Sequence, residues 1–113
     1  MQDCLFCKIV RGEILSTKVY EDNEVYAFLD IDPRAPFHTI IIPKQHISSA
    51  AEIDSTNSQV ISKVFEAAAK IAKQENLENG FRIVNNCGAD GGQTVGHIHF
   101  HLLARRNLAW PPG

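Results

Sequence analysis

Hydrophobic and polar residues alternate along five short stretches of this chain. Successive side chains of a β-strand point to opposite faces, so alternation with a period of two predicts strands. The five predicted strands cover residues 18–20, 25–29, 38–42, 81–86 and 96–103. The polar segment 21–24 joins the first two strands, which predicts a hairpin, and Pro43 is expected to end the third strand.

Apolar residues recur with helical spacing in the middle of the chain. They form one stripe, made of Val60, Ile61, Val64, Phe65, Ala68, Ile71 and Ala72. Asp54 or Ser55 is expected to cap the start of this long helix, because both side chains accept hydrogen bonds from free N–H groups. The pair Asn79-Gly80 is expected to end it in the left-handed conformation.

A second, short helix is predicted over residues 4–10, with Asp3 as its cap. Its buried side chains are expected to be Leu5, Phe6 and Ile9. No repeat or linker divides the chain, so residues 1–113 are predicted to form one domain. The predicted fold class is α+β: a five-stranded antiparallel sheet with one long helix and a short N-terminal helix.

The last predicted strand carries three histidines at alternate positions, His97, His99 and His101. Their imidazoles therefore share one face, while the apolar residues between them pack on the other. Imidazole titrates near neutrality and can act as nucleophile, proton carrier or metal ligand. One zinc held by all three rings is disfavoured, because the outer two lie ~13 Å apart along a strand. A solvated polar face is the other alternative to acid–base or nucleophilic chemistry.

A glycine-rich loop, residues 85–96, leads directly into the histidine strand. Glycines allow positive φ, so successive N–H groups can form a nest for an anion, and Asn86, Gln93 and Thr94 add side-chain donors. A histidine that faces a bound phosphate can attack phosphorus through a covalent intermediate. We therefore interpret the loop as a phosphate-binding segment, with a plain connecting loop as the alternative.

The pattern His-φ-His-φ-His-φ-φ, in which φ is an apolar residue, resembles the signature of the histidine triad (HIT) superfamily. Three further stretches, FLDI at 28–31, APFH at 35–38 and WPPG at 110–113, resemble its nucleotide-binding phosphoramidase branch more than its diadenosine polyphosphate hydrolases. With the opening CLFCKIVRGEI, the resemblance covers nearly the whole chain. It implies a homodimer whose two sheets join into one larger sheet.

The resemblance implies a hydrolase of nucleoside 5′-monophosphoramidates, such as purine nucleotides linked to amines. His99 would attack the α-phosphorus and form a nucleotidyl-histidine. His101 would contact the phosphate and the leaving group, and His38 would orient the nucleophile and share its proton. The chemistry would need no metal.

The resemblance also implies the nucleotide contacts. The phosphate oxygens would be held by Asn86, Gly92 and Thr94, where Thr94 replaces a serine that is frequent in the family but keeps the hydroxyl. The ribose would be bound by Asp30. The pocket for the base would be lined by Phe6, Ile9, Phe28 and Ile31. Trp110 would reach toward the leaving-group side of the partner subunit's site.

Other functions stay open from the sequence. A dinucleoside polyphosphate hydrolase or nucleotidylyl transferase would use the same residues, because nothing in them separates a P–N from a P–O–P leaving group. A nucleotide-binding interaction module with incidental turnover, or a metal sensor, would be a different class of protein.

The segment Cys4-Leu5-Phe6-Cys7 is a C-x-x-C pair, which supplies two of the four ligands of a tetrahedral zinc site. His46 and His97 are not needed for the catalytic chemistry. The resemblance to bacterial relatives implies a structural zinc held by Cys4, Cys7, His46 and His97. Two buried free cysteines or a redox pair are the alternatives.

The composition limits the partners further. The net charge is −2 and no basic run is present, so we interpret Arg105-Arg106 as solvated surface and expect no nucleic-acid partner. No apolar stretch approaches the ~20 residues of a membrane span, and we expect neither a secretory signal nor a membrane partner. Three cysteines, an odd number, argue against a disulfide framework. The chain is therefore expected to be cytoplasmic.

Overall fold

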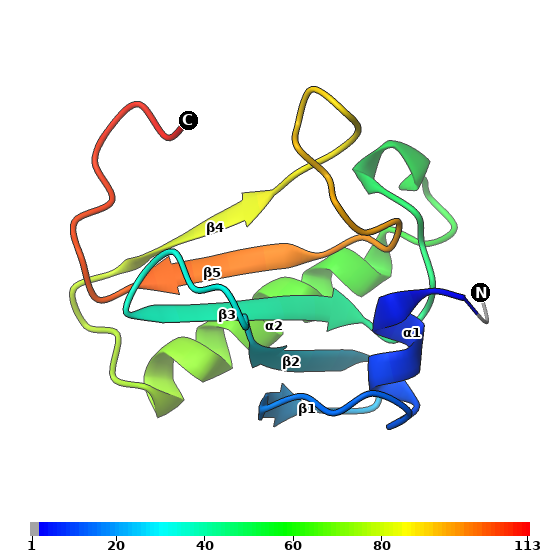
Figure 1. Cartoon of the computed structure of the whole chain (residues 1–113), viewed down its shortest axis with the longest axis horizontal. Coiled ribbons are helices and arrows are strands. Elements are labelled where there is room, and N and C mark those ends of the chain that lie inside the picture. Colours follow the sequence, from blue (N-terminus) through cyan, green and yellow to red (C-terminus); the bar gives the residue numbers. More distant parts are fainter. Residues whose placement is uncertain (1–2) are drawn as a thin grey trace.

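The computed structural model describes residues 3–113 and contains a five-stranded antiparallel sheet in the order β1-β2-β3-β5-β4 (Figure 1). The elements are α1 (Leu5–Val10), β1 (Lys18–Glu21), β2 (Val25–Leu29), β3 (Phe37–Pro43), the 3₁₀ turn η1 (Ala50–Glu52), α2 (Gln59–Gln74), β4 (Phe81–Asn85) and β5 (Phe100–Ala104). This arrangement confirms the predicted α+β fold class. Within residues 3–113, neither α-helix has the length and apolar character needed to cross a membrane.

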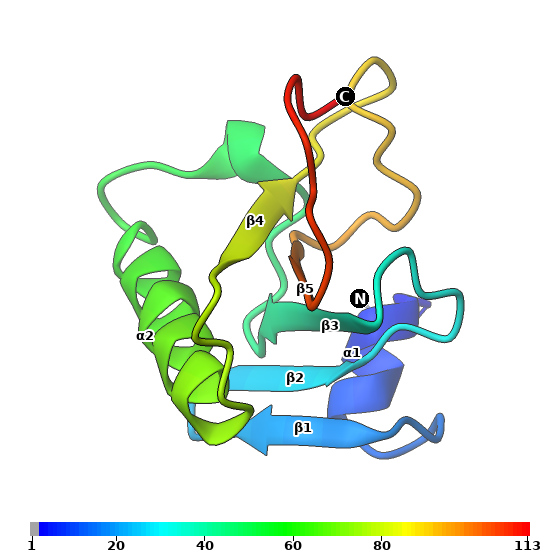
Figure 2. The same ribbon diagram turned by 90° about the vertical axis from the view of Figure 1, so that its left-hand side faces the viewer.

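Helices cover both faces of the sheet, α2 on one side and α1 on the other (Figure 2). Alternation along β2 sends Val25 and Ala27 into the core beneath α2. The residues between and after them, Tyr26 and Phe28, pack in a second cluster with Phe6 of α1. The α1 face is therefore apolar around β2 and β3, and the histidines described below lie on this face.

The start of α2 differs from the prediction. The Asp54 carboxylate accepts hydrogen bonds from the Thr56 N–H (2.8 Å) and from the Thr56 hydroxyl (2.6 Å), which closes a separate turn. The Ser58 N–H then donates to the Asp54 carbonyl. The helix begins only at Gln59, so neither Asp54 nor Ser55 is its cap.

The end of α2 also lies earlier than predicted. Asn76 has a positive φ of 57°, and its N–H donates to the Lys73 carbonyl. The next N–H, that of Leu77, donates to the Ala72 carbonyl at 2.9 Å. This pair of bonds is a Schellman motif with asparagine at the left-handed position. The predicted stop at residues 79–80 is therefore wrong.

The predicted apolar stripe of α2 is confirmed except at Phe65, and it gains Ala67. Val64, Ala68 and Ile71 are buried as predicted, and Ala67 is buried with them. Phe65 is 49% exposed, so its assignment to the core is wrong. Its ring contacts that of Phe100 on β5 edge-on, with centroids 6.0 Å apart, so only part of it packs on the sheet.

Cys4, and not Asp3, caps α1. The Cys4 Sγ accepts a hydrogen bond from the Cys7 N–H at 3.4 Å. Two of the three apolar residues predicted to be buried in this helix are buried, but Leu5 is 43% exposed.

The last strand begins at Phe100, later than predicted, so His97 and His99 precede β5. The Ile98 N–H donates to the Ile47 carbonyl at 2.7 Å, which holds this segment against residue 47 instead of β3. The predicted alternation of faces is kept: Ile98 is buried in the α2 core, and the histidine rings lie on the α1 side.

Candidate functional site

A pocket of about 370 Å³ lies between α1 and the sheet. Its lining is mostly apolar, and its polar side chains are the imidazoles of His99 and His101, the Asp30 carboxylate and the hydroxyls of Ser16 and Thr94. Eight of the residues predicted to bind nucleotide line it: Phe6, Ile9, Phe28, Asp30, Ile31, Thr94, His99 and His101. Ile31 is fully exposed and forms part of the rim.

The hydrogen bonds of His99 fix which of its nitrogens is free. Its Nδ1 lies 2.7 Å from the backbone carbonyl of His97. A carbonyl can only accept, so in the neutral ring Nδ1 carries the proton and Nε2 carries a lone pair. The ring is 3% exposed and packs edge-on against Phe6, with centroids 5.1 Å apart. His99 therefore presents an unprotonated nitrogen, held in one orientation, at a pocket wall.

His38 and His101 form a directed pair. Ile40 of β3 pairs with His101 of β5, so His38 lies diagonally from His101 on the same face. The Arg34 N–H donates to His38 Nδ1 at 3.0 Å, so the proton of a neutral His38 is on Nε2. This Nε2 lies 2.8 Å from His101 Nδ1. His101 Nδ1 is then the acceptor, and its proton is on Nε2.

The pKa values agree with this assignment. Burial lowers the pKa of His38, and the Asp30 carboxylate opposes the shift only in part. Burial also lowers the pKa of His101 to about 4, helped by the positive charge that His99 and His38 carry when protonated. Both rings are therefore neutral at pH 7 in the free protein.

Among the described residues, His38 bonds to His101, and the His101 ring lies edge-on to that of the predicted nucleophile His99, with centroids 5.2 Å apart, so the predicted orienting role of His38 would act through His101. Asp30 Oδ2 lies 3.4 Å from His38 Nε2 and 3.9 Å from His101 Nδ1. These three groups are close enough to be considered as metal ligands. However, two nitrogens on one tetrahedral zinc lie about 3.3 Å apart, whereas this pair lies at hydrogen-bond distance. The cluster is a proton-sharing pair beside a carboxylate.

A second cluster combines the C-x-x-C pair with two histidines, as predicted. The ligand atoms of Cys4, Cys7, His46 and His97 all lie within 4.8 Å of one another. His97 is completely buried, and its Nε2 lies 2.8 Å from the Pro43 carbonyl. Its proton is therefore on Nε2, and Nδ1 faces the two sulfur atoms with a free lone pair.

The distances in this second cluster fit a metal ion. A tetrahedral zinc with Zn–S and Zn–N bonds of ordinary length separates sulfur from nitrogen by about 3.5 Å. The Sγ to Nδ1 distances are 3.4 Å for Cys4–His97, 3.4 Å for Cys7–His46 and 3.6 Å for Cys7–His97. Burial raises the pKa of the Cys7 thiol, and a bound cation is what would favour its thiolate. The residues therefore fit a zinc ion.

The profile of the HIT domain family matches residues 11–108. The chain belongs to the HIT family. It is 46% identical over 111 residues to the "14 kDa zinc-binding protein" of Zea mays, covering 96% of this chain and 87% of the relative. It is 42% identical to "Adenylylsulfatase HINT1" of Arabidopsis thaliana, covering 96% and 76%. A solved structure described as a HIT family hydrolase from Legionella pneumophila matches with a TM-score of 0.95 at 47% identity, covering 98% of this chain and all of that chain.

The glycine-rich loop of this HIT family chain is held by Gln93. The Gln93 amide donates to the carbonyls of Ser48 (2.7 Å) and Val95 (2.9 Å), and its oxygen accepts from the Gly88 N–H (3.0 Å). These bonds occupy both ends of the amide. The prediction that Gln93 binds nucleotide is therefore corrected: its side chain shapes the loop, and Thr94 beside it faces the pocket.

Three other predicted contacts do not line the pocket of their own chain: Asn86, Gly92 and Trp110. Gly92 has a φ of +78°, which favours glycine and turns the loop before Thr94. Trp110 is 82% exposed in the C-terminal segment. The Arg82 guanidinium donates to the carbonyls of Leu108 and Ala109 and so holds this segment against β4.

Sequence reasoning missed two residues that support the HIT histidines. The Asn85 side chain donates to the His99 carbonyl at 2.9 Å, at the start of the loop. The Arg34 N–H sets the tautomer of His38. Asn85 is adjacent to the predicted Asn86, but a backbone N–H has no signature in the sequence.

Proposed function

We propose that this HIT family protein hydrolyses nucleotides at the α-phosphorus through a nucleotidyl-His99 intermediate. The family and its relatives support a nucleotide hydrolase in general. The finer proposal is that nucleoside 5′-monophosphoramidates are preferred substrates. The observation that carries the proposal is the free Nε2 of His99 in a largely apolar pocket that His101, with its proton on Nε2, also lines.

In the first step, His99 Nε2 forms a bond to phosphorus while the bond from phosphorus to the amine nitrogen breaks. The amine leaves with a proton from His101 Nε2. Neutral His101 already carries its one proton on Nε2, so we infer that a second proton binds at Nδ1 as the anionic substrate binds, because a nearby phosphate raises the pKa of imidazole. The carboxylate of Asp30 lies where it can accept N–H groups from both His38 and His101 in that charged state.

In the second step, water attacks phosphorus and the bond from phosphorus to His99 Nε2 breaks. His101 Nε2, which has lost its proton, takes one from the water and is ready for the next cycle. The His99 Nδ1–H stays bonded to the His97 carbonyl throughout, so the phosphorylated ring carries a positive charge and is a good leaving group. The products are the amine and the nucleoside 5′-monophosphate, and the steps need no metal.

A purine is the base that we propose for the pocket. The rings of Phe6 and Phe28 meet edge to face with centroids 5.6 Å apart, and with Ile9 and Ile40 they line its apolar part. A planar base buries more apolar surface there when it has two rings.

A second candidate leaving group is one joined through oxygen. The relative named adenylylsulfatase supports an anhydride substrate, and the same geometry would serve a dinucleoside polyphosphate. The deciding experiment compares an AMP-linked alkylamine, adenylyl sulfate and diadenosine tetraphosphate with the purified protein, followed by phosphorus NMR. Faster cleavage of the amine supports the phosphoramidase. Binding without cleavage of any of the three would leave a nucleotide-binding module instead.

We also propose that one structural zinc binds Cys4, Cys7, His46 and His97. The sulfur-to-nitrogen distances and the orientation of the His97 lone pair support this, as does the relative named a zinc-binding protein. The ion would tie α1 to the segment before β5 and supply rigidity, not a reacting group. Metal analysis of protein purified without added metal tests it, with about one zinc per chain expected.

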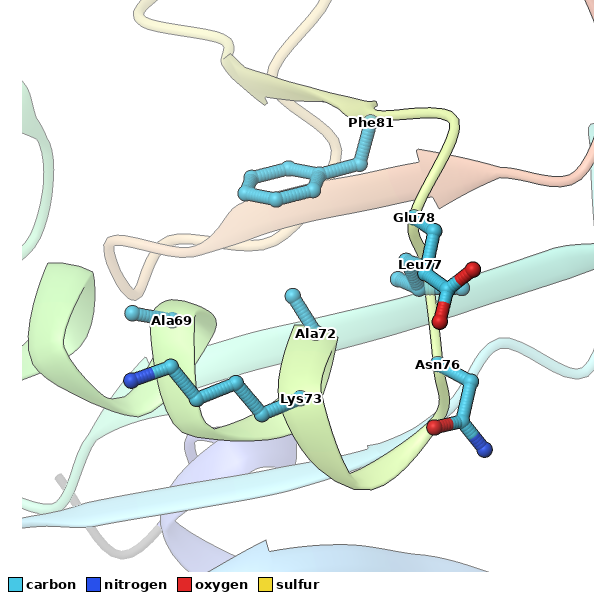
Figure 3. A pocket seen from close by; sticks show the side chains of 7 residues that line it. All are labelled: Ala69, Ala72, Lys73, Asn76, Leu77, Glu78 and Phe81. Atoms are coloured by element: carbon cyan, nitrogen blue, oxygen red, sulfur yellow. The ribbon is translucent and has the colours of Figure 1, made fainter.

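We further propose a homodimer that forms through β4 and the adjoining face of α2. β4 is an edge strand of the sheet, and such edges are normally covered. Figure 3 shows Phe81 over Ala69 and Ala72, above a hollow of about 470 Å³ that Leu77 also lines. Phe81 on β4 is 41% exposed, and Phe65 on α2 is 49% exposed. Phe81→Glu is expected to give a monomer by light scattering after size exclusion.

A further inference from the structure

Arg106 binds the loop that precedes β3, across 72 positions of the sequence. Its Nε and Nη2 donate to the backbone carbonyl of Arg34 at 3.2 and 2.9 Å. Two donors from one planar guanidinium fix the direction of that carbonyl better than a single bond would. Arg106 is exposed, as the sequence predicted for the pair Arg105-Arg106, but its guanidinium is held in place by these two bonds.

Arg34 is the residue whose N–H donates to His38 Nδ1. The same residue is thus held at its carbonyl by Arg106 and at its amide by His38. Its side chain points elsewhere, because the Arg34 guanidinium pairs with Asp32 at 2.9 Å. The backbone of one residue therefore connects Arg106 to the histidine pair.

We propose that Arg106 is a positioning residue for the leaving-group proton. It holds the Arg34 backbone where its N–H keeps the His38 proton on Nε2. The Nε2–H of His38 in turn keeps Nδ1 of His101 an acceptor, so the proton of His101 stays on its Nε2, in the ring that lines the pocket. Arg106 does not line the pocket and acts only through these groups. The kinetic consequence rests on the proposed function, whereas the tautomer of His38 does not.

Arg105 is a matched control beside Arg106. Its guanidinium donates to the Glu75 carbonyl at 2.9 Å and lies over the ring of Phe37, 5.0 Å from the centroid. Among the described residues, its hydrogen bonds go to Glu75, and none joins it to Arg34 or to a histidine. Arg105→Ala removes the same charge from the same segment and is expected to lower stability without altering the histidine pair.

The first test reads the tautomer directly, without substrate. Nitrogen NMR of the histidine rings is recorded for the wild type, Arg106→Ala, Arg106→Lys and Arg105→Ala. The wild type and Arg105→Ala are expected to show His38 protonated on Nε2 only. Arg106→Ala is expected to show exchange between both tautomers, with Arg106→Lys in between. An unchanged His38 signal in folded Arg106→Ala would overturn the proposal.

The second test uses the leaving group to separate positioning from a general structural effect. Arg106→Ala is expected to lower kcat roughly tenfold or more for an AMP-linked alkylamine, which must leave with a proton, at nearly constant KM. For the p-nitrophenyl ester of AMP, which leaves as a stable anion, we expect a loss within about threefold. Equal losses for both substrates contradict the proposal. If the wild type cleaves no amine, the proposed function fails, and the NMR test still decides the role of Arg106.

Discussion

Two clusters on the α1 side of the sheet use histidine in different ways. In the pair proposed to be catalytic, His38 Nε2 and His101 Nδ1 lie 2.8 Å apart, at the distance of one shared proton. In the Cys/His cluster, Sγ and Nδ1 atoms lie 3.4 to 3.6 Å apart, at the distance of two ligands on one ion. Residue type alone does not decide the role of a histidine here.

The difference comes from the backbone group that binds the other ring nitrogen. The Pro43 carbonyl takes the Nε2–H of His97, which leaves Nδ1 free for a metal. The His97 carbonyl takes the Nδ1–H of His99, which leaves Nε2 free for phosphorus. His97 thus belongs to both clusters, through its ring in one and its carbonyl in the other. The proposed metal ligand is also the group that orients the proposed nucleophile.

The largest expected effect is that of His99→Ala. Without the attacking nitrogen, we expect turnover of the AMP-linked amine to fall by roughly 10⁴-fold or more. Metal content and the unfolding transition are expected to stay close to those of the wild type, because His99 is no ligand. Single-turnover kinetics checks the loss of turnover, and metal analysis of the same sample checks that the metal content is unchanged. A variant that keeps a tenth of the wild-type rate would show that His99 is not the nucleophile.

The next effect concerns the metal cluster. Cys7→Ser is expected to lose the zinc and to lower the free energy of unfolding by about 3 kcal/mol or more, because the ion binds only the folded chain. Cys87→Ser is the matched control, since Cys87 is the free cysteine outside the cluster. Urea denaturation and elemental analysis measure the two variants. A Cys7→Ser protein with full metal content would remove Cys7 from the ligand set.

The faces of the strands and the site residues of these clusters could be predicted from the sequence. Alternation placed the three triad histidines on one side, and the C-x-x-C pair indicated a metal ligand set. The ends of the elements could not be predicted, because local bonds decided them. Asp54 closes a turn instead of capping α2, and Asn76 ends that helix before the more obvious Asn79-Gly80.

The tautomers of the histidines likewise could not be predicted from the sequence. They depend on the Arg34 N–H and on the carbonyls of Pro43 and His97, and any residue type supplies such groups. The same holds for Arg106, whose partner is a carbonyl far away in the chain. Sequence patterns report side chains and their spacing, whereas these contacts depend on where the backbone passes.

A smaller effect is expected in the pH dependence of stability. The folded-state pKa of His101 is lowered to about 4 from 6.5, by burial first, by His99 and His38 next, and against the effect of Asp30. The unfolded chain therefore binds the proton first as the pH falls. The contribution to stability is complete above pH 6.5 and is lost progressively toward pH 4, by about 3 kcal/mol at most. The free energy of unfolding, measured by urea denaturation between pH 7 and 4, should fall less steeply with pH in His101→Gln than in the wild type. An equal pH dependence in the two proteins would contradict the lowered pKa of His101.

The smallest effect tests which carboxylate of the loop before β3 belongs to the pocket. Asp30 lines it, whereas Asp32 is exposed and pairs with Arg34. Asp30→Asn keeps the shape but weakens the acceptor for a ribose hydroxyl, so the Kd of AMP is expected to rise about tenfold, or ~1.4 kcal/mol. Asp32→Asn is expected to leave the Kd within about twofold, by calorimetry. Because Asp30 Oδ1 also accepts the Asp32 N–H, equal weakening in both variants would mean that loop order, and not a direct contact, sets the affinity.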